Sequence, residues 1–391
     1  MKKYILIVII LSMFFTAAMP ISAEEKSKDD SNVKLAPDAK SAILIERDTG
    51  KTLFDKNANE KLPPASMTKI MTLLLIMESL DKGKLKMDEM VRVSERASSM
   101  GGSQIFLEAG EEMSVENLLK GIAIASGNDA SVALAERIAG SEEAFVKKMN
   151  EKVKALNLEN TKFQNTTGLP AEDHYSTSYD MAIIAKELLK YETITKFTSI
   201  YEDYLRKGEE NEFWLVNTNK LVKFYPGVDG LKTGFTNEAK YCLTATAKKN
   251  DMRVIAVVMG AETPKKRNAT VSSMLDYAFN HFETKKLYEK DQLITKLQLT
   301  KAENKNINIV ASQSISTLHE KGASTEKVKT VVELDDNITL PMEKGEQVGT
   351  LYVKNGEKIL SKTPLTIDQD VKRASYITFL KRSLQKMTKS Q

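Results

Sequence analysis

Cysteine and histidine are both scarce in this chain of 391 residues, which contains one cysteine and three histidines. Because Cys242 is the only thiol, no intrachain disulfide can form and a lipid-modified N-terminal cysteine is excluded. His174, His281 and His319 are scattered and no two have the spacing of zinc ligands, which argues against a metallopeptidase. The formal net charge is only +4, so composition does not indicate nucleic-acid binding. We therefore predict a protein without metal or cofactor.

The N-terminus has the pattern of a secretory signal peptide. Two lysines precede an apolar run, and Ile-Ser-Ala at 21–23 offers a small-residue cleavage site, which predicts cleavage after Ala23. An uncleaved anchor is the alternative, although the apolar run is slightly short for a membrane span. Residues 24–38 are charged and polar and are expected to form a flexible leader. Export without disulfides suits a bacterial envelope protein at the outer face of the cytoplasmic membrane or in the cell wall.

The centre of the chain is a serine followed three residues later by a lysine. Ser66 and Lys69 stand between Pro63-Pro64 and the apolar run 70–77, which is typical of a buried helix. If Ser66 opens that helix, the Lys69 ammonium lies one turn on and on the same face as the hydroxyl. A serine with a basic nitrogen at that distance can act as a nucleophile, and the helix start favours a developing oxyanion.

The surrounding pattern predicts a domain of mixed helices and strands over residues 39–284. Strand-like runs at 41–46 and 52–54 flank a turn, and two long β-branched runs form a central antiparallel pair. Helical spacing and caps predict further helices, with Ser114 capping one that delivers Ser126 at its end. The predicted ranges are strands 241–247 and 253–260 and helices 116–124, 129–138, 141–156, 177–191 and 268–281. We therefore expect an α/β (α+β) arrangement with a mainly antiparallel sheet.

Two further motifs accompany the serine and lysine. Ser-Gly-Asn stands at 126–128 and Lys-Thr-Gly at 232–234, in the order known for penicillin-recognising serine enzymes. The longer runs 64–69, 125–130 and 227–234 look like those of the penicillin-binding D-alanyl-D-alanine carboxypeptidases. The resemblance covers residues 36–283 closely and implies the fold of the serine β-lactamases and transpeptidases.

The three motifs supply the groups that acyl transfer needs. Ser66 is the expected acyl-ester nucleophile and Lys69 the general base, if burial or nearby positive charge lowers its pKa. Ser126 can relay a proton to the leaving nitrogen, while the Asn128 amide can hold the substrate backbone and donate to Lys69.

The third motif is expected to bind the substrate. Lys232 and Thr233 can bind its carboxylate, and Gly234 lets the peptide backbone lie close to the strand. The resemblance implies an oxyanion hole from the backbone N–H groups of Ser66 and Phe235, and a carboxylate-binding role for Arg267. Arg267 stands in the basic run 264–267, which could equally be a solvated turn.

The resemblance also implies the reaction. A peptidoglycan stem peptide ending in D-Ala-D-Ala would acylate Ser66, release the terminal D-alanine and then be freed by water. β-Lactam antibiotics would mimic that dipeptide and act as inhibitors. Glu238-Ala239-Lys240 departs from the family, which commonly has a glycine before the tyrosine, and this concerns substrate preference rather than the class of reaction.

Several rival functions share part of this pattern. A serine β-lactamase would need a deacylating glutamate where the chain has Val153. A transpeptidase or endopeptidase differs only in the acceptor, and an inactive cell-wall-binding protein could retain the fold. The Asp173-His174 pair lacks the Gly-x-Ser-x-Gly elbow of other serine hydrolases, so His174 is expected to fix its loop by a hydrogen bond.

The last hundred residues have a different sequence pattern. Short strand-like runs with turns between them predict a small all-β domain over 289–366, in which His319 is expected at the surface. Residues 371–391 form a basic amphipathic pattern, with apolar residues on one helical face and lysine and arginine opposite. We expect this segment to bind an anionic membrane surface, the alternative being a helix packed on the β domain.

Overall fold

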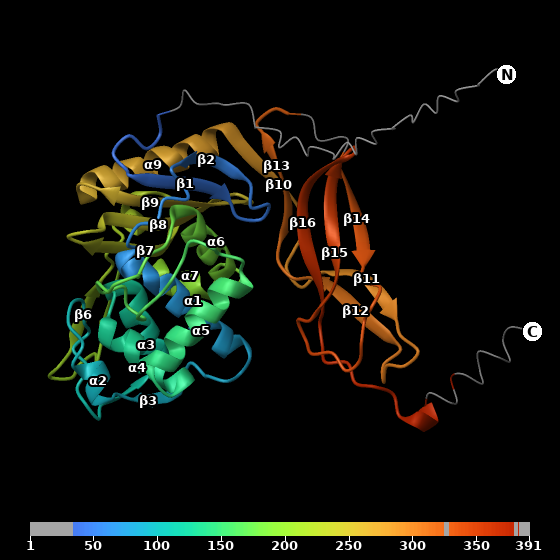
Figure 1. The fold of residues 1–391 in the computed structure, drawn as a ribbon, viewed down its shortest axis with the longest axis horizontal. Coiled ribbons are helices and arrows are strands. Elements are labelled where there is room, and N and C mark those ends of the chain that lie inside the picture. The colour runs from blue at the N-terminus through green and yellow to red at the C-terminus, as the bar shows by residue number, and fades with distance from the viewer. Residues whose placement is uncertain (1–33, 324–327, 379–381, 383–391) are drawn as a thin grey trace, which may run out of the picture. The chain divides into compact units, whose positions relative to one another are not determined.

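The computed structural model describes residues 34–323, 328–378 and Arg382 (Figure 1). In this part of the chain, elements β1 to α9 form a larger module and β10 to β16 form a β module. No helix among the described residues is long and apolar enough to cross a membrane. The predicted signal peptide at 1–23 lies outside them.

A five-stranded antiparallel sheet is the framework of the larger module. Its strands, in spatial order, are β2 (Thr52–Lys56), β1 (Ser41–Glu46), β9 (Met252–Ala261), β8 (Lys240–Lys249) and β7 (Val228–Thr236). The predicted hairpin β1–β2 and the central pair β8–β9 are confirmed. Within the described residues β7 pairs with β8 alone, so the other edge of β7 forms no strand pairing.

Both faces of this sheet are buried, because successive side chains of a strand point to opposite faces. On β9, Ile255 and Val257 belong to one hydrophobic core, while Val254 and Ala256 belong to a second core on the other face. Helix α9 (Pro264–His281) covers the second face. Its first turn starts earlier than predicted, since Thr263 caps the helix and a proline occupies its first position.

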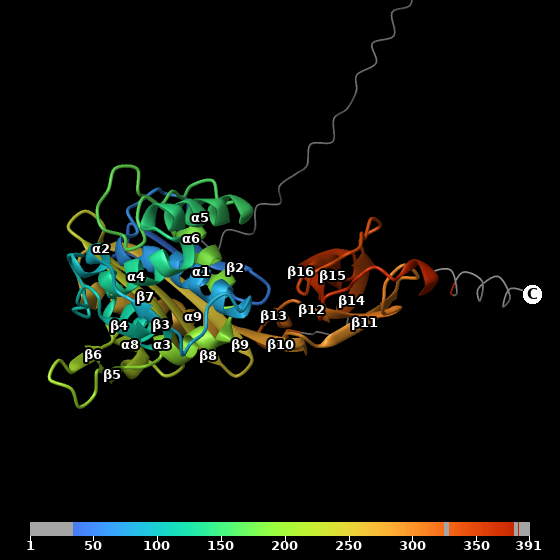
Figure 2. The ribbon, with the colours of Figure 1, turned by 90° about the horizontal axis from the view of Figure 1, so that it is seen from below.

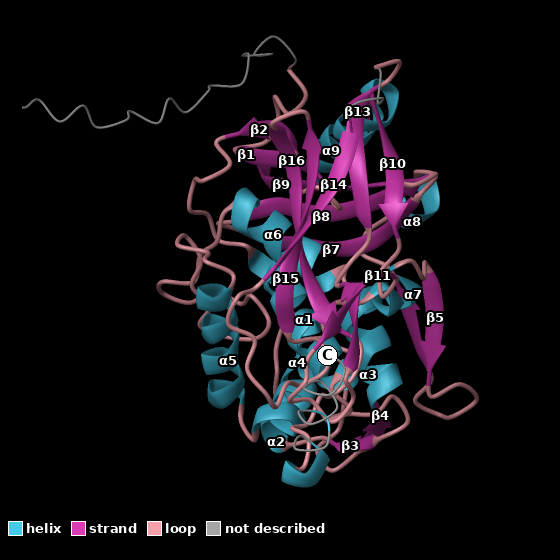
Figure 3. Ribbon diagram, turned by 90° about the vertical axis from the view of Figure 1, so that its right-hand side faces the viewer, coloured by secondary structure: helices cyan, strands magenta, loops and turns pink. Residues whose placement is uncertain are grey.

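The first core lies between the sheet and a group of helices, which Figures 1 and 3 show on the side of the sheet away from α9. Its centre is α1 (Lys69–Asp81), which is buried nearly all round as predicted and contacts α6 (Ser178–Leu188). Further helices on this side are α2 (Glu95–Ser98), α3 (Val115–Lys120), α4 (Asn128–Ala139), α5 (Glu142–Ala155) and α7 (Thr195–Thr198), whereas Leu221 of the short helix α8 (Leu221–Phe224) belongs to the second core. Two small hairpins pair β3 (Met90–Arg92) with β4 (Glu112–Ser114) and β5 (Glu202–Leu205) with β6 (Phe213–Val216).

The β module consists of antiparallel strands around a core of its own (Figure 2). Its strands are β10 (Phe282–Tyr288), β11 (Leu293–Gln298), β12 (Asn306–Ala311), β13 (Ile315–Glu320), β14 (Val328–Leu334), β15 (Gln347–Asn355) and β16 (Lys358–Ile367). One sheet has the order β11-β12-β16-β15-β14, and β10 pairs with β13. The predicted class, an α/β domain with a mainly antiparallel sheet followed by a small β domain, is confirmed.

Two features of the C-terminal region differ from expectation or fall outside the description. His319 on β13 is partly exposed, which agrees in part with the predicted surface position, and its Nε2 lies 2.6 Å from the Thr317 hydroxyl. Most of the predicted amphipathic helix at 371–391 lies outside the described residues. In its described part the helix prediction is wrong at the start, because Val371 and Arg373 form isolated β-bridges with Met342 and Ala302 and helix begins only at Tyr376. Arg382 donates to the backbone carbonyls of Ala302 and Glu303 in the β module.

Candidate active site

Ser66 lies in a 3₁₀ turn, Ala65–Thr68, that runs directly into α1. The sequence predicted that Ser66 opens the α-helix itself; the structure instead forms a tighter turn there, in which Met67 N donates to Pro64 O over 3.1 Å. Ala65 has a φ of 47°, which is uncommon for a residue with a Cβ atom and marks a constrained backbone just before the serine. The buried helix that follows holds the nucleophile turn in place.

Lys69 is fully buried beneath Ser66 and makes three contacts. Its ammonium lies 3.2 Å from Ser66 Oγ, 2.6 Å from Asn128 Oδ1 and 2.9 Å from the carbonyl oxygen of Thr167. Among the described residues, this group donates no hydrogen bond to a carboxylate. The amine is therefore aimed at the serine hydroxyl without being fixed in its charged form by an ion pair.

The electrostatics of the site favour a neutral amine. Burial, and then the nearby Lys232 ammonium, hold the pKa of Lys69 well below its ordinary value. Burial and the Arg267 guanidinium lower the pKa of Lys232 to about 7. A lysine with a depressed pKa, hydrogen-bonded to a serine hydroxyl, is a competent general base.

The second motif follows a π-helical turn, Gly121–Ala125, at the end of α3. Ser126 has a left-handed backbone (φ 65°), and its buried hydroxyl has no hydrogen-bond partner among the described residues. Asn128 accepts from Lys69 through Oδ1 and donates through Nδ2 to Gly101 O over 2.6 Å. The expectation that the Asn128 amide donates to Lys69 was thus wrong, because its oxygen faces the Lys69 nitrogen while its NH₂ group is engaged by Gly101 O.

The third motif lies on the edge strand β7, whose open side faces the turn of Ser66. The structure places Lys232 in a buried position, and Thr233 Oγ1 donates to Thr218 Oγ1 over 2.8 Å. A Cβ atom on Gly234 would lie 2.8 Å from the carbonyl oxygen of Pro64, so only glycine allows the strand to approach the turn this closely. Phe235 follows on the same strand with an exposed ring.

Arg267 lies in the first turn of α9 and is only 5% exposed. The alternative of a solvated basic turn is therefore wrong. The guanidinium donates to Asn268 Oδ1 and contributes to lowering the pKa of Lys232, so the two cations are close. Together they provide positive charge where the motif on β7 would receive a carboxylate.

Two backbone carbonyls and one hydroxyl that sequence reasoning missed complete the site. The carbonyls of Thr167 and Gly101 accept from Lys69 and Asn128, and Thr218 supports Thr233. The glycine at position 168 was the one sequence signal for this loop. Gly168 has a φ of 84°, and a Cβ atom there would lie 1.8 Å from the Ala65 carbonyl oxygen, so the loop approaches the nucleophile turn closely.

His174 ties the same loop to the nucleophile turn. Its Nε2 lies 2.8 Å from Thr68 Oγ1, and Gln164 N donates to its Nδ1 over 3.1 Å. Within the described part of the chain the ring forms no hydrogen bond with Ser66 or Lys69, and the predicted loop-fixing hydrogen bond is present. No group of three side chains suited to a metal ion is found among the described residues.

Comparison with known proteins agrees with this geometry. A family model described as D-alanyl-D-alanine carboxypeptidase matches residues 26–263, and one described as the C-terminal domain of penicillin-binding protein 5 matches residues 282–373. The D-alanyl-D-alanine carboxypeptidase DacF of Bacillus subtilis is 59% identical over 389 residues, which is 100% of both chains.

More distant relatives share the fold and much of the chain. A D-alanyl-D-alanine endopeptidase of Pseudomonas aeruginosa is 29% identical over 67% of this chain and 84% of its own length. The crystal structure of penicillin-binding protein 5 from Haemophilus influenzae is 32% identical and superimposes with a TM-score of 0.66, covering 86% of this chain and 98% of that one. The chain therefore belongs to the family of D-alanyl-D-alanine carboxypeptidases.

Proposed function

We propose that the enzyme removes the terminal D-alanine from peptidoglycan stem peptides through an ester on Ser66. Ser66 Oγ attacks the carbonyl carbon of the penultimate D-alanine while its proton passes to the neutral amine of Lys69. The C–N bond then breaks, the leaving amine takes a proton through Ser126, and D-alanine departs. The contact that carries this proposal is the 3.2 Å approach of the buried Lys69 amine to Ser66 Oγ.

The strand β7 and the helix start supply the rest of the chemistry. Lys232, Thr233 and Arg267 bind the substrate carboxylate, and Asn128 and Gly234 hold its backbone. The backbone N–H groups of Ser66 and Phe235 stabilise the oxyanion. Water then attacks the ester carbonyl and gives a proton to Lys69, which returns one to Ser66 as the shortened peptide leaves.

β-Lactam antibiotics acylate the same serine in this proposal, and their esters hydrolyse slowly. Within the described residues, no carboxylate hydrogen-bonds to Ser66 or Lys69 and thus none is held there to activate water. Val153, at the position where a β-lactamase would need its glutamate, is a buried core residue of α5. These observations favour a penicillin-sensitive carboxypeptidase over a β-lactamase.

Release of D-alanine from a soluble peptide ending in D-Ala-D-Ala tests the activity, with a Ser66→Ala variant alongside. Release that disappears in the variant supports both the reaction and its nucleophile. Release of an internal fragment from a cross-linked peptide, without free terminal D-alanine, would instead favour the endopeptidase alternative. No release from a folded protein would contradict the proposal.

We further propose that residues 1–23 direct export, that the enzyme works at the outer face of the membrane, and that residues 371–391 bind an anionic membrane surface. The separate basic and apolar faces expected for 371–391 support binding to the membrane surface. The contacts of Arg382 instead support packing of this segment on the β module. Flotation with anionic vesicles, with and without residues 371–391, separates the two. Equal binding by both forms would contradict the membrane proposal, and an intact mass that includes Met1 would contradict cleavage.

A further inference from the structure

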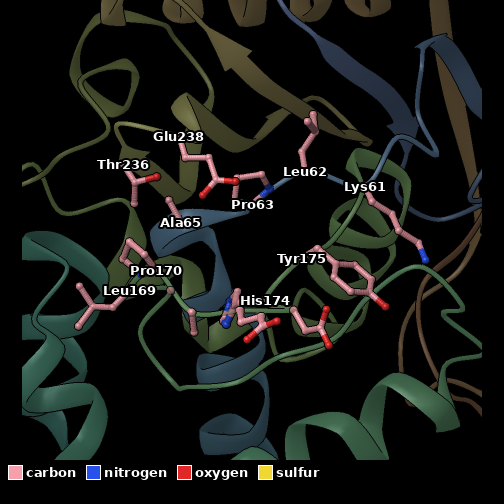
Figure 4. Close-up of a pocket in the computed structure, with 14 residues that line it drawn as sticks. Lys61, Leu62, Pro63, Ala65, Leu169, Pro170, His174, Tyr175, Thr236 and Glu238 are labelled. Atoms are coloured by element: carbon pink, nitrogen blue, oxygen red, sulfur yellow. The ribbon is translucent and has the colours of Figure 1, made fainter.

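A cavity of about 660 Å³ opens beside the nucleophile turn (Figure 4). Ala65 lies at one wall, next to Ser66, and Thr236 lies at another, one residue beyond Phe235 on β7. The loop from Gly168 to Tyr175, the segment from Lys61 to Pro63, and Glu238 complete the lining. The cavity thus adjoins the site of the proposed reaction, although none of the proposed catalytic groups lines it.

The order of the binding groups along β7 indicates what reaches this cavity. The substrate carboxylate lies at Lys232 and Thr233, and the scissile carbonyl lies at Ser66 and Phe235. The residues that precede the C-terminal D-alanine therefore lie successively closer to Thr236. An extended residue spans about 3.3 Å, so the residue preceding D-Ala-D-Ala arrives next to Thr236, where the cavity begins.

The charges on the cavity walls favour a cation. Figure 4 shows the Glu238 side chain turned inward towards Pro63 and Ala65. Glu172 also lines the cavity, and neither glutamate takes part in an ion pair among the described residues. Asp173 is already paired with Lys162 over 3.1 Å.

The one lysine in the lining does not neutralise the two glutamates. The Lys61 ammonium lies over the Tyr175 ring, 4.7 Å from its centroid, and forms no ion pair among the described residues. In Figure 4 its side chain points away from Glu238. Two uncompensated carboxylates therefore remain at the place where the third residue from the substrate's C-terminus arrives.

We propose that this cavity binds the side chain of the residue preceding D-Ala-D-Ala and favours one that ends in an ammonium group, as in a diamino acid. The inference rests on the proposed function, because the direction of the peptide is set by the carboxylate clamp and the oxyanion site. Glu238 and Glu172 are specificity-determining residues in this assignment. Since both are solvent-exposed, each contributes modestly, and the preference is expected to be about fivefold.

Two peptides that differ only at the ε-amine, which is charged in one and acetylated in the other, test the proposal. The full-length protein is given acetyl-Lys-D-Ala-D-Ala with a free ε-amine, or the same peptide with that amine acetylated, and kcat/KM is measured for D-alanine release. The free-amine peptide is expected to be cleaved about fivefold more efficiently, mainly through a lower KM, with a preference that falls as salt is added. Equal values for the two peptides would overturn the proposal.

Substitutions at the two glutamates test whether these residues cause the preference for the free-amine peptide. Glu238→Gln and Glu172→Gln together should bring the ratio of the two kcat/KM values close to one, and each single variant should lower it in part. Glu151→Gln, which removes an exposed carboxylate from α5 outside the cavity, should leave the ratio and both rates unchanged. A ratio that survives the double variant would overturn the assignment.

Failure of the proposed function has a separate signature. If neither peptide is cleaved while penicillin still acylates Ser66, the carboxypeptidase activity is contradicted, and the peptides are then used to slow that acylation. Stronger protection by the free-amine peptide would still support the cavity as its binding site. Equal protection would overturn it.

Discussion

The pH dependence of stability is predicted to contain a contribution from one buried histidine. His174 is 8% exposed, and its Nδ1 accepts the N–H of Gln164 over 3.1 Å. The ring proton of the neutral form is therefore on Nε2, which donates to Thr68 Oγ1 over 2.8 Å. Burial lowers the pKa of His174 from 6.5 to about 4. Protonation would place a charge in the buried region and remove the acceptor for Gln164.

The direction of the change in unfolding free energy with pH follows from proton binding. Between these two pKa values the unfolded chain binds a proton at His174 that the folded chain does not, so folding becomes less favourable as pH falls. The stabilisation is fully present above about pH 6.5 and is lost as pH falls from there through about 4. The gap between 6.5 and about 4 corresponds to about 3 kcal/mol, of which about 2 kcal/mol is lost by about pH 5.

A His174→Gln variant isolates this contribution. The glutamine amide can still donate to Thr68 but does not titrate, while nearby charged groups, Lys61, Glu172, Asp173 and Glu238, are common to both proteins. Urea unfolding of both is followed by the fluorescence of the single tryptophan, which lies on β6 in the larger module.

The quantity to compare is the difference in unfolding free energy between the two proteins. The advantage of the protein with His174 over the variant should shrink by about 2 kcal/mol between about pH 7.5 and about pH 5. A difference that stays constant over this range would refute the assignment of a neutral, buried imidazole.

Three other substitutions probe the site from different sides. Gly168→Ala should destabilise the protein by about 3 kcal/mol or more and slow acylation by penicillin, because φ is 84° and the new Cβ would lie 1.8 Å from the Ala65 carbonyl oxygen; near-normal acylation and stability would contradict the close contact. Asp129→Ala removes a buried carboxylate that accepts three backbone N–H groups and should cost about 2–4 kcal/mol in urea unfolding, whereas a loss well below that would show that these groups find other partners. Lys232→Met removes the like charge beside Lys69, so the pKa of Lys69 should rise. The pH range over which the rate of acylation by penicillin increases should then move upward, and an unchanged range would exclude Lys69 as the titrating base.

Much of the framework could be predicted because local chemistry and tertiary packing agree there. The apolar run after Lys69, the serine cap at Ser114 and the β-branched run of β9 each have a pattern that the structure satisfies directly. The side chains of the three motifs come together because α1, the end of α3 and β7 meet at one edge of the sheet.

The parts that could not be predicted depend on groups without a sequence signature. Every residue has a carbonyl, so nothing singled out those of Thr167 and Gly101 as partners of Lys69 and Asn128. The burial of Arg267 depends on α9 packing over the sheet, which a basic run of residues does not reveal. The direction of the Asn128 hydrogen bond was predicted wrongly because donor and acceptor are equally available in an amide.

Acylation of Ser66 is the most direct test of the account. The protein is incubated with benzylpenicillin and digested with trypsin, and the mass of the peptide spanning residues 62–69 is measured, with the Ser66→Ala variant treated in parallel. The account predicts that this peptide gains the mass of one penicillin molecule and that the corresponding peptide of the variant gains none. Labelling of a different peptide, or labelling of the variant, would contradict the assignment of Ser66 as the nucleophile.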